Sequence, residues 1–423
     1  MDRLVVTGGT RLHGSVRISG AKNSALKLMA ASLLAEGETV IENVPHIADC
    51  LTMAEVLDRL GAGASWEGSS LRIDASGALE VETPYELVSQ MRASIVVLGP
   101  LLARQGRARV AMPGGCNIGS RKIDLHLKGF ERMGARFSYD HGFLNATAPS
   151  LRGAMISLDF PSVGATENIL MAAVGATGTT VIENAAREPE IQDLAAMLVQ
   201  MGAKIDGAGS TTMEIHGVDG FTAVRHRVIP DRIEAGTFAI AVCATGGSVT
   251  IEEGRAEHLD LVLDKLGEAG ATVEAKDRSV RVEMSERPRQ IDLVTLPFPG
   301  FPTDLQPQMM ALLAAARGTS IVTENVFESR FMFVDELNRM GADIRTEGHH
   351  AVIRGVDRLS AAPVRALDIR AGAAMVIAAL AADGTTDIAD IHHVDRGYED
   401  LEGRLTSLGA EVRREPSPWP AER

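Results

Sequence analysis

The chain has 423 residues, of which 45% are hydrophobic, and a formal net charge of −14. This length allows two or three domains, and the composition excludes a disordered chain. The negative charge argues against non-specific binding to nucleic acid or to a membrane surface, because both need a broad positive potential. No apolar stretch reaches the ~18 residues that cross a bilayer, and three widely spaced cysteines predict neither disulfides nor a metal site. We therefore expect a cytoplasmic protein.

A repeat organises the chain. Six times, at intervals of about 70 residues, a helical pattern ends in an apolar residue followed by Gly-Ala, which is the kind of self-similarity to be sought first in a sequence. The six glycines are Gly61, Gly134, Gly202, Gly270, Gly341 and Gly409.

The first repeat predicts the order of elements in all six. A helix from about Lys22 to Ala35 is apolar on nearly all sides, which predicts burial on all sides. A strand over 39–44, an amphipathic helix over 48–60 and two short strands follow. If three buried helices share one core, six repeats make two α/β domains. We expect one domain over 21–229, a second formed by 1–20 together with 230–413, and a disordered Pro-rich tail over 414–423.

Cations stand at the starts of three of the buried helices. Alignment of the repeats places Lys22, Arg92 and Arg370 there, where a positive charge opposes the helix dipole. A helix N-terminus attracts anions, so these cations predict a site for a multiply charged anion between the domains. Arg330 and Arg396 follow strands and fit either this site or the surface. Helix caps are expected from Ser94, Thr166, Thr237 and Thr303.

The loop over 113–126 carries the candidate reactive thiol. Cys116 lies among three glycines, with Arg121 five residues further on, whereas Cys243 lies in an apolar run. Such a loop can approach a substrate closely and act as a lid, although a buried cysteine beside an ordinary turn would also fit the pattern.

Several motifs together resemble one family. They are Ser19-Gly20-Ala21-Lys22-Asn23, Met91-Arg92-Ala93-Ser94, the loop over 113–126, 162–166, 184–190, 301–304 and Asp395-Arg396-Gly397-Tyr398. The chain resembles the UDP-N-acetylglucosamine enolpyruvyl transferases, within the enolpyruvyl transferase family, from Met1 to about Arg413. The resemblance implies two inside-out α/β barrel domains of three repeats each.

The resemblance also implies a reaction. The enolpyruvyl group of phosphoenolpyruvate passes to the 3-hydroxyl of UDP-N-acetylglucosamine with release of phosphate, in the first committed step of peptidoglycan precursor synthesis. No metal or other cofactor is implied. Cys116 would protonate the methylene carbon and form a covalent adduct, and Asp304 would take the proton of the attacking hydroxyl. Lys22 and Arg396 complete the catalytic set.

The implied substrate contacts form two groups. Phosphate and carboxylate would be held by Lys22, Arg121, Arg370 and Arg396, and Arg330 is a further candidate only from its position after a strand. The nucleotide sugar would be held by Asn23, Arg92, Arg121, Lys122, Ile123, Asp124, Leu125, Ser162, Val163, Gly164, Asp304 and Val326.

Two departures from the family pattern keep alternatives open. Lys122 stands where the family often has proline, and Phe160-Pro161 where some members have lysine. Both positions belong to the nucleotide end, so the acceptor could be another uridine nucleotide, such as UMP. Transfer to shikimate 3-phosphate fits less well, because that branch lacks such a cysteine loop, and the full set of functional residues argues against a silent binding protein. The sequence predicts neither protein partners nor an oligomeric state.

Overall fold

The computed structural model describes residues 2–112 and 123–417, without the side chains of Ser89, Gln90 and Arg92. The predicted site residues Cys116, Arg121 and Lys122 lie outside this range. The described residues form two compact units. The first unit holds 20–112 and 123–229, and the second holds 2–19 and 230–417. Each unit is described by itself.

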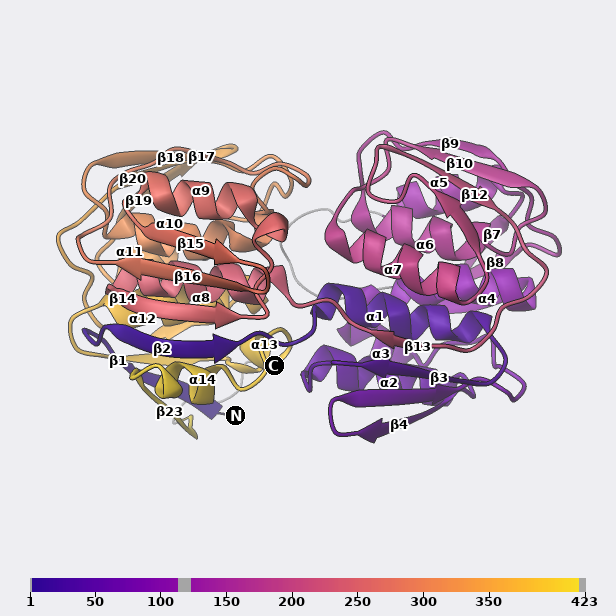
Figure 1. The fold of residues 1–423 in the computed structure, drawn as a ribbon, viewed down its shortest axis with the longest axis horizontal. Coiled ribbons are helices and arrows are strands. Elements are labelled where there is room, and N and C mark those ends of the chain that lie inside the picture. The colour runs from indigo at the N-terminus through magenta and orange to yellow at the C-terminus, as the bar shows by residue number, and fades with distance from the viewer. Residues whose placement is uncertain (1, 113–122, 418–423) are drawn as a thin grey trace. The chain divides into compact units, whose positions relative to one another are not determined.

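The first unit places three sheets around buried helical segments (Figure 1). The buried segments are α1 (Lys22–Ala31) with η1 (Ser32–Leu34), then η2 (Arg92–Val97) with α4 (Leu98–Gln105), and finally α6 (Val163–Ala173); α3 (Tyr85–Gln90) precedes η2 and begins with the exposed residues Tyr85 and Glu86. The amphipathic helices are α2 (Ala48–Arg59), α5 (Asp124–Arg132) and α7 (Pro189–Gln200). The strands are β3 (Glu38–Glu42), β4 (Gly63–Glu67), β5 (Ser70–Asp74), β6 (Arg107–Ala111), β7 (Arg136–Asp140), β8 (Phe143–Thr147), β9 (Met155–Ser157), β10 (Thr179–Glu183), β11 (Lys204–Asp206), β12 (Thr212–His216) and β13 (Arg225–Arg227).

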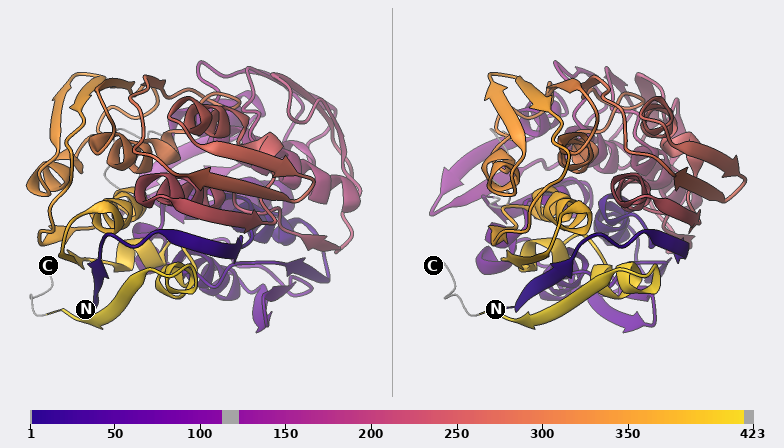
Figure 2. Two further views of the ribbon diagram at one scale, coloured as in Figure 1. Left: turned by 60° about the vertical axis from the view of Figure 1, so that its left-hand side comes forward. Right: turned by 90° about the vertical axis from the view of Figure 1, so that its left-hand side faces the viewer.

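The second unit repeats this plan, and the right-hand view of Figure 2 shows its sheets at the periphery of the helices. Its buried helices are α8 (Arg232–Thr245), α10 (Gln306–Ala314), preceded by η4 (Thr303–Leu305), and α12 (Ile369–Ala381). The remaining helices are η3 (Ala256–His258), α9 (Asp260–Glu268), α11 (Val334–Arg339), α13 (His392–Asp395) and α14 (Leu401–Ser407). The strands are β1 (Asp2–Thr7), β2 (Leu12–Arg17), β14 (Gly247–Glu252), β15 (Thr272–Lys276), β16 (Ser279–Met284), β17 (Leu293–Val294), β18 (Thr319–Thr323), β19 (Asp343–Glu347), β20 (His350–Arg354), β21 (Val364–Arg365), β22 (Thr385–Ala389) and β23 (Glu411–Pro416).

The six sheets share one topology. The strand after each buried helix has an antiparallel neighbour, which belongs to a hairpin in five sheets and is the N-terminal strand β1 in the sixth. In five sheets it also pairs parallel with a strand from elsewhere in the chain: β3 lies between β5 and β13, and β14 between β16 and β2. In the second repeat the parallel strand is reduced to a single bridge from Glu82 to Arg109, which leaves the three-stranded sheet β6-β8-β7. The predicted α/β fold of six repeats, three in each unit, is confirmed.

The marker glycines have a conformational role. All six, from Gly61 to Gly409, follow an amphipathic helix and have positive φ, between 87° and 112°. A side chain is strained in this left-handed region, so glycine ends the helix at low cost. The repeat is visible in the sequence because each turn needs the same residue at the same place.

The predicted helix caps were wrong. The side chains that cap buried helices are Ser162 at α6, Asp231 at α8 and Asp368 at α12. The four residues expected as caps form other bonds: Ser94 and Thr237 donate to carbonyls of the preceding turn, Thr166 accepts from the amide of Ala186, and Thr303 donates to Glu324. Each lies inside or beside its helix start, where nearby backbone and side-chain groups compete for the hydroxyl.

The predicted disordered tail begins too early. Residues 414–416 belong to β23, which pairs antiparallel with β1 at the other end of the chain. Arg414 also bonds to Asp395 and Glu402. The prolines concealed this strand, because an edge strand tolerates proline and its partner is remote in sequence.

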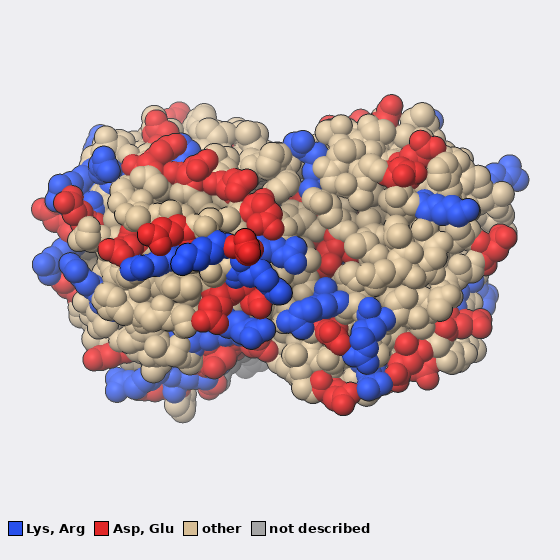
Figure 3. All heavy atoms as spheres, viewed as in Figure 1, with Lys and Arg blue, Asp and Glu red and all other residues tan. Residues whose placement is uncertain are grey.

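Acidic and basic side chains are mixed on the face drawn in Figure 3, and neither charge forms a large continuous patch there. Within the described ranges, no helix is long and apolar enough to cross a membrane. The same ranges hold no group of three His, Cys, Asp or Glu side chains arranged to bind a metal ion.

Candidate functional site

The second unit gathers one carboxylate and two guanidinium groups at the starts of α10 and α12. Asp304 lies in η4, and its Oδ2 accepts bonds from Arg370 Nε at 3.1 Å and Nη2 at 3.0 Å. Its Oδ1 accepts a bond from Arg330 Nη2 at 3.1 Å. The arginine side chains are 1% and 5% exposed, but that of Asp304 is 24% exposed. Asp304 is therefore the most exposed member of an otherwise buried group of charges.

Both arginines retain unused donors. Arg330 Nε and Nη1 and Arg370 Nη1 are buried and have no hydrogen-bond partner among the described residues. A buried charged donor without an acceptor is costly, and an anion could supply the missing acceptors. The arrangement is therefore suited to a carboxylate or phosphate group.

The Arg370 guanidinium packs against Tyr398, which in turn bonds to residues that the sequence did not single out as functional. Its Cζ lies 5.5 Å from the centre of the Tyr398 ring. The Tyr398 hydroxyl forms hydrogen bonds with Thr237 Oγ1 at 3.0 Å and Gln308 Nε2 at 3.1 Å. Burial lowers the pKa of Arg370, but the charge of Asp304 and smaller contributions from Tyr398 and Asp231 raise it above its ordinary value. The guanidinium therefore stays charged. The motif Asp395-Arg396-Gly397-Tyr398 was the only sequence signal that pointed to Tyr398 as its neighbour.

Glu324 fixes the position of Asp304 and of the predicted contact Val326. Its Oε2 accepts a bond from Thr303 Oγ1 at 2.9 Å, next to Asp304 in the chain. Its Oε1 accepts from the amides of Val326 at 2.7 Å and Phe327 at 3.1 Å. Glu324 is 1% exposed, and nothing in its sequence context marked it as important.

Arg396 follows α13 and is half-buried. The turn after it runs along Arg370, because a Cβ added to Gly397 would lie 3.6 Å from Arg370 Nη1 and only 2.4 Å from a carbon of Ile369. Gly397 is thus required by close packing. The turn brings the Arg396 segment to the same side of α12 as Arg370.

In the first unit, Lys22 and Asn23 form the first turn of α1. Lys22 Nζ pairs with Asp49 Oδ2 at 2.8 Å, and both side chains are buried. A carboxylate therefore compensates the cation that the sequence placed against the helix dipole. Asn23 is partly exposed and remains accessible at the helix start.

The starts of α5 and α6 lie together in the same unit. Ser162 caps α6 by accepting a bond from Ala165 N at 3.3 Å. A Cβ added to Gly164 would lie 3.3 Å from two ring atoms of His126, so this glycine allows close approach. His126 Nδ1 lies 3.1 Å from Asn168 Nδ2, which ties α5 to α6.

The predicted contacts at these two starts differ in exposure. Asp124 is exposed at the first position of α5, Leu125, Val163 and Gly164 are half-buried, and Ile123 is buried. The sequence included His126 in the 113–126 motif without assigning it a role, and it did not single out Asn168.

The structure thus places the predicted residues in three groups. Arg330 and Arg370 each contact Asp304 in the second unit. Lys22 and Asn23 lie on α1, and 123–125 and 162–164 lie at the paired starts of α5 and α6 in the first unit.

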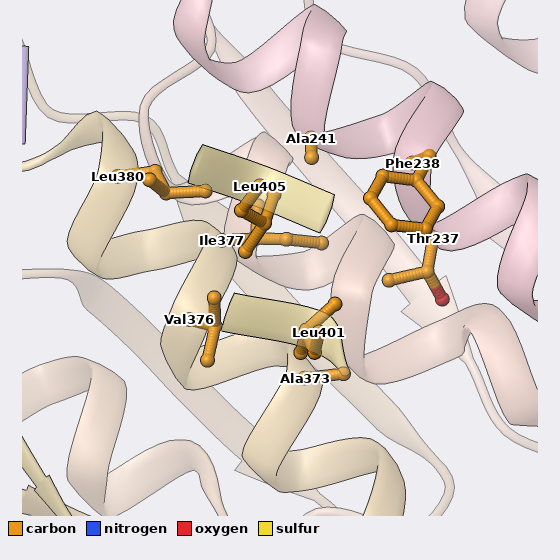
Figure 4. A pocket seen from close by; sticks show the side chains of 9 residues that line it. All are labelled: Thr237, Phe238, Ala241, Ala373, Val376, Ile377, Leu380, Leu401 and Leu405. Carbon is orange, nitrogen blue, oxygen red and sulfur yellow. The ribbon is translucent and has the colours of Figure 1, made fainter. Parts of the chain in front are cut away.

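A small cavity in the second unit is not a substrate site. Its volume is about 10 Å³, and its lining side chains are apolar except for Thr237 (Figure 4). Such a volume is about the minimum for one water molecule, and the Thr237 hydroxyl is already bonded to Tyr398 and to the Ile233 carbonyl. The cavity is a packing defect among α8, α12 and α14.

Comparisons with known proteins identify the family of the chain. The model of the EPSP synthase (3-phosphoshikimate 1-carboxyvinyltransferase) family matches residues 6–405. The chain is 56% identical over 413 residues to the UDP-N-acetylglucosamine 1-carboxyvinyltransferase of Corynebacterium jeikeium and 55% identical to that of Mycobacterium tuberculosis, covering 98% of this chain and 99% of each relative. The crystal structure of the enolpyruvyl transferase NikO from Streptomyces tendae superposes with a TM-score of 0.89 at 29% identity and covers 99% of both chains. The chain therefore belongs to the EPSP synthase family of carboxyvinyl, or enolpyruvyl, transferases.

Proposed function

We propose that the protein is a UDP-N-acetylglucosamine 1-carboxyvinyltransferase. It transfers the enolpyruvyl group of phosphoenolpyruvate to the 3-hydroxyl of UDP-N-acetylglucosamine and releases phosphate. The observation that carries the chemistry is the Asp304 carboxylate held between Arg330 and Arg370, whose remaining buried donors have no acceptor among the described residues. The choice of acceptor is supported by relatives of that name that match 98% of the chain at 55–56% identity.

Asp304 has the geometry of the base. Two arginines hold its carboxylate in place, while part of the side chain remains exposed. As the hydroxyl oxygen bonds to the central carbon of phosphoenolpyruvate, its proton passes to Asp304. The methylene carbon takes a proton from Cys116 and becomes a methyl group. The Cys116 thiolate then takes a proton back from this methyl group, and phosphate departs with the proton held by Asp304, which restores the double bond and returns both residues to their starting state.

The cations provide the electrostatic part of catalysis. Arg330 and Arg370 offer buried N–H groups to the carboxylate or phosphate of phosphoenolpyruvate, and Lys22, Arg121 and Arg396 supply further positive charge. Fixed donors in a site that excludes water stabilise charge that develops in the transition state. Cys116 also forms the covalent adduct with phosphoenolpyruvate that the family resemblance implies.

The nucleotide sugar is held mainly by helix starts. Asn23 on α1, the starts of α5 and α6 and the backbone near Val326 provide its contacts, with Arg92, Arg121 and Lys122. Lys122 and Phe160 alter the nucleotide end and leave the reacting groups unchanged. From this activity we infer a cytoplasmic protein that acts at the first committed step of peptidoglycan precursor synthesis.

The test is phosphate release from phosphoenolpyruvate with the purified full chain, with UDP-N-acetylglucosamine and UMP as alternative acceptors. We expect turnover with the nucleotide sugar, its abolition in Cys116→Ala, and a fall in kcat of about 10³-fold in Asp304→Asn, as for removal of a general base. Arg339→Gln, a change on the exposed side of α11, is the control and should retain activity. Turnover with UMP alone would reject the proposed acceptor, and no turnover with either would reject the proposed function.

A further inference from the structure

A buried ion pair joins the two helices whose first turns carry predicted nucleotide-sugar contacts. Lys27 lies on α1, one turn after Asn23, and Glu167 lies on α6, one turn after Gly164. Lys27 Nζ is 3.4 Å from Glu167 Oε2. The two residues are 7% and 0% exposed.

Lys27 also bonds directly to the first turn of its own helix. Its Nζ donates to the backbone carbonyl of Asn23 at 2.7 Å. Neither carboxylate oxygen of Glu167 has a hydrogen-bond partner among the described residues. One ammonium group therefore links the Asn23 carbonyl to a carboxylate that has little other support.

The ion pair links two helices whose main neighbours differ. α1 packs mainly against α2 and α7, whereas α6 packs mainly against α4 and α5; α6 also contacts α7, and both helices contact η2. Lys27 and Glu167 add a direct side-chain link between α1 and α6. The pair is placed where it can set the spacing between Asn23 and 162–164.

Stability is a poor explanation for this pair. Removing two charges from water costs several kcal/mol each, and a buried pair is often no more stable than well-packed apolar residues. The charged groups that act on Glu167 are Lys27 from α1 and Glu190 and Glu188 at the start of α7. Burial raises its pKa to about 7, Lys27 opposes this rise, and the two glutamates add to it. The pair is thus maintained at a cost.

We propose that Lys27 and Glu167 are positioning residues that fix the first turns of α1 and α6 for binding of the nucleotide sugar. The inference rests on the proposed function and adds to it two residues that need not touch the substrate. Their effect is expected in affinity for the nucleotide sugar and not in the chemical step.

The first experiment separates positioning from stability. The variants are Lys27→Met, Glu167→Gln and the double variant Lys27→Met/Glu167→Leu, whose apolar side chains can pack where the charges were. In all three we expect KM and Kd for UDP-N-acetylglucosamine to rise by about tenfold, while kcat and KM for phosphoenolpyruvate change by less than about threefold. Urea unfolding should show the double variant at least as stable as the wild type, since no charge remains buried without a partner.

The second readout is pH, which a purely structural role would not move. Glu167 attracts the Lys27 ammonium fully only when its carboxylate is ionised, so Kd for the nucleotide sugar alone should fall as the pH rises through about 7 in the wild type. In Glu167→Gln the same titration should be flat. Omitting phosphoenolpyruvate keeps its own titrating phosphate out of the measurement.

The control is Ile182→Val, a truncation of a fully buried residue on β10 in the same unit. It should lower stability by about 1 kcal/mol and leave KM for the nucleotide sugar unchanged. A stable double variant with wild-type KM would overturn the positioning role and leave the proposed function intact. Absence of wild-type turnover with UDP-N-acetylglucosamine would instead reject both.

Discussion

Two buried glutamates, one in each unit, have similar titration behaviour and different surroundings. Glu167 on α6 and Glu234 on α8 are both fully buried, and burial raises the pKa of each to about 7. Glu234 Oε2 accepts a bond from Ser19 N at 2.8 Å, and its Oε1 accepts one from Arg404 Nη1 at 2.7 Å. Glu167 has neither kind of bond and faces Lys27 at 3.4 Å.

The difference shows that a pKa alone does not identify a role. Glu234 belongs to a bonded network in which Arg404 also donates to Ser19 Oγ at 2.6 Å and to Glu399 at 2.9 Å. Its carboxylate anchors the segment at Ser19, so its role is structural. Glu167 has no such network and lies one turn after the predicted binding residues at the start of α6. Hydrogen-bond satisfaction separates the two, because burial contributes to both in the same way.

The largest change in stability is expected when the charged partner of Glu234 is removed. Arg404→Met should lower the free energy of unfolding by about 3–5 kcal/mol, because a buried carboxylate loses its counter-charge. Lys27→Met should cost less, since Lys27 is the weaker partner of Glu167. Urea unfolding at pH 8 measures both, and a larger loss in Lys27→Met would contradict the assignment of Glu234 as the anchored group.

The pH dependence of stability tests the contribution of each glutamate. Both glutamates have a folded pKa of about 7 against an ordinary 4.5, so between these values the folded state holds more protons than the unfolded state. Stability should therefore fall as the pH rises from about 4.5 to 7, on the order of 3 kcal/mol per group. Glu167→Gln and Glu234→Gln should each remove part of this slope.

Activity then distinguishes the same two variants. Glu167→Gln should also change affinity for the nucleotide sugar, whereas Glu234→Gln should change mainly stability. Unfolding midpoints at several pH values, with binding measured in parallel, test this pair of outcomes. An unchanged slope in both variants would show that other groups control the acid side of the stability curve.

The smallest expected effect concerns a group that is fully bonded and also functional. Tyr398→Phe removes one hydroxyl that bonds to Thr237 and Gln308 beneath Arg370. We expect a loss of about 1 kcal/mol in stability and a rise of a few-fold in KM for phosphoenolpyruvate, because the guanidinium loses part of its support. Thr237→Val, which keeps the phenol, should give a smaller change in KM; equal or larger effects would place the support at Thr237 instead.

Local patterns explain where sequence reasoning succeeded and failed. The buried helices were recognisable because Leu26, Leu28 and Met29 lie on different sides of α1 and are all buried. The cap predictions failed because Thr166 and Thr303 find partners on other elements. The tail was misjudged because β23 is a strand only through its pairing with β1.

The repeat, the order of elements and most of the charged residues of the site could be predicted from the amino-acid sequence alone. These depend on neighbouring residues: glycine where φ must be positive, apolar side chains all round a buried helix, and motifs that resemble a family. The pairing of charged side chains that are distant in the sequence became visible only in the tertiary structure. Asp304 binds arginines 26 and 66 residues away, and Lys27 lies opposite Glu167 on another repeat. Such pairings arise when helices pack side by side, and no local pattern records them.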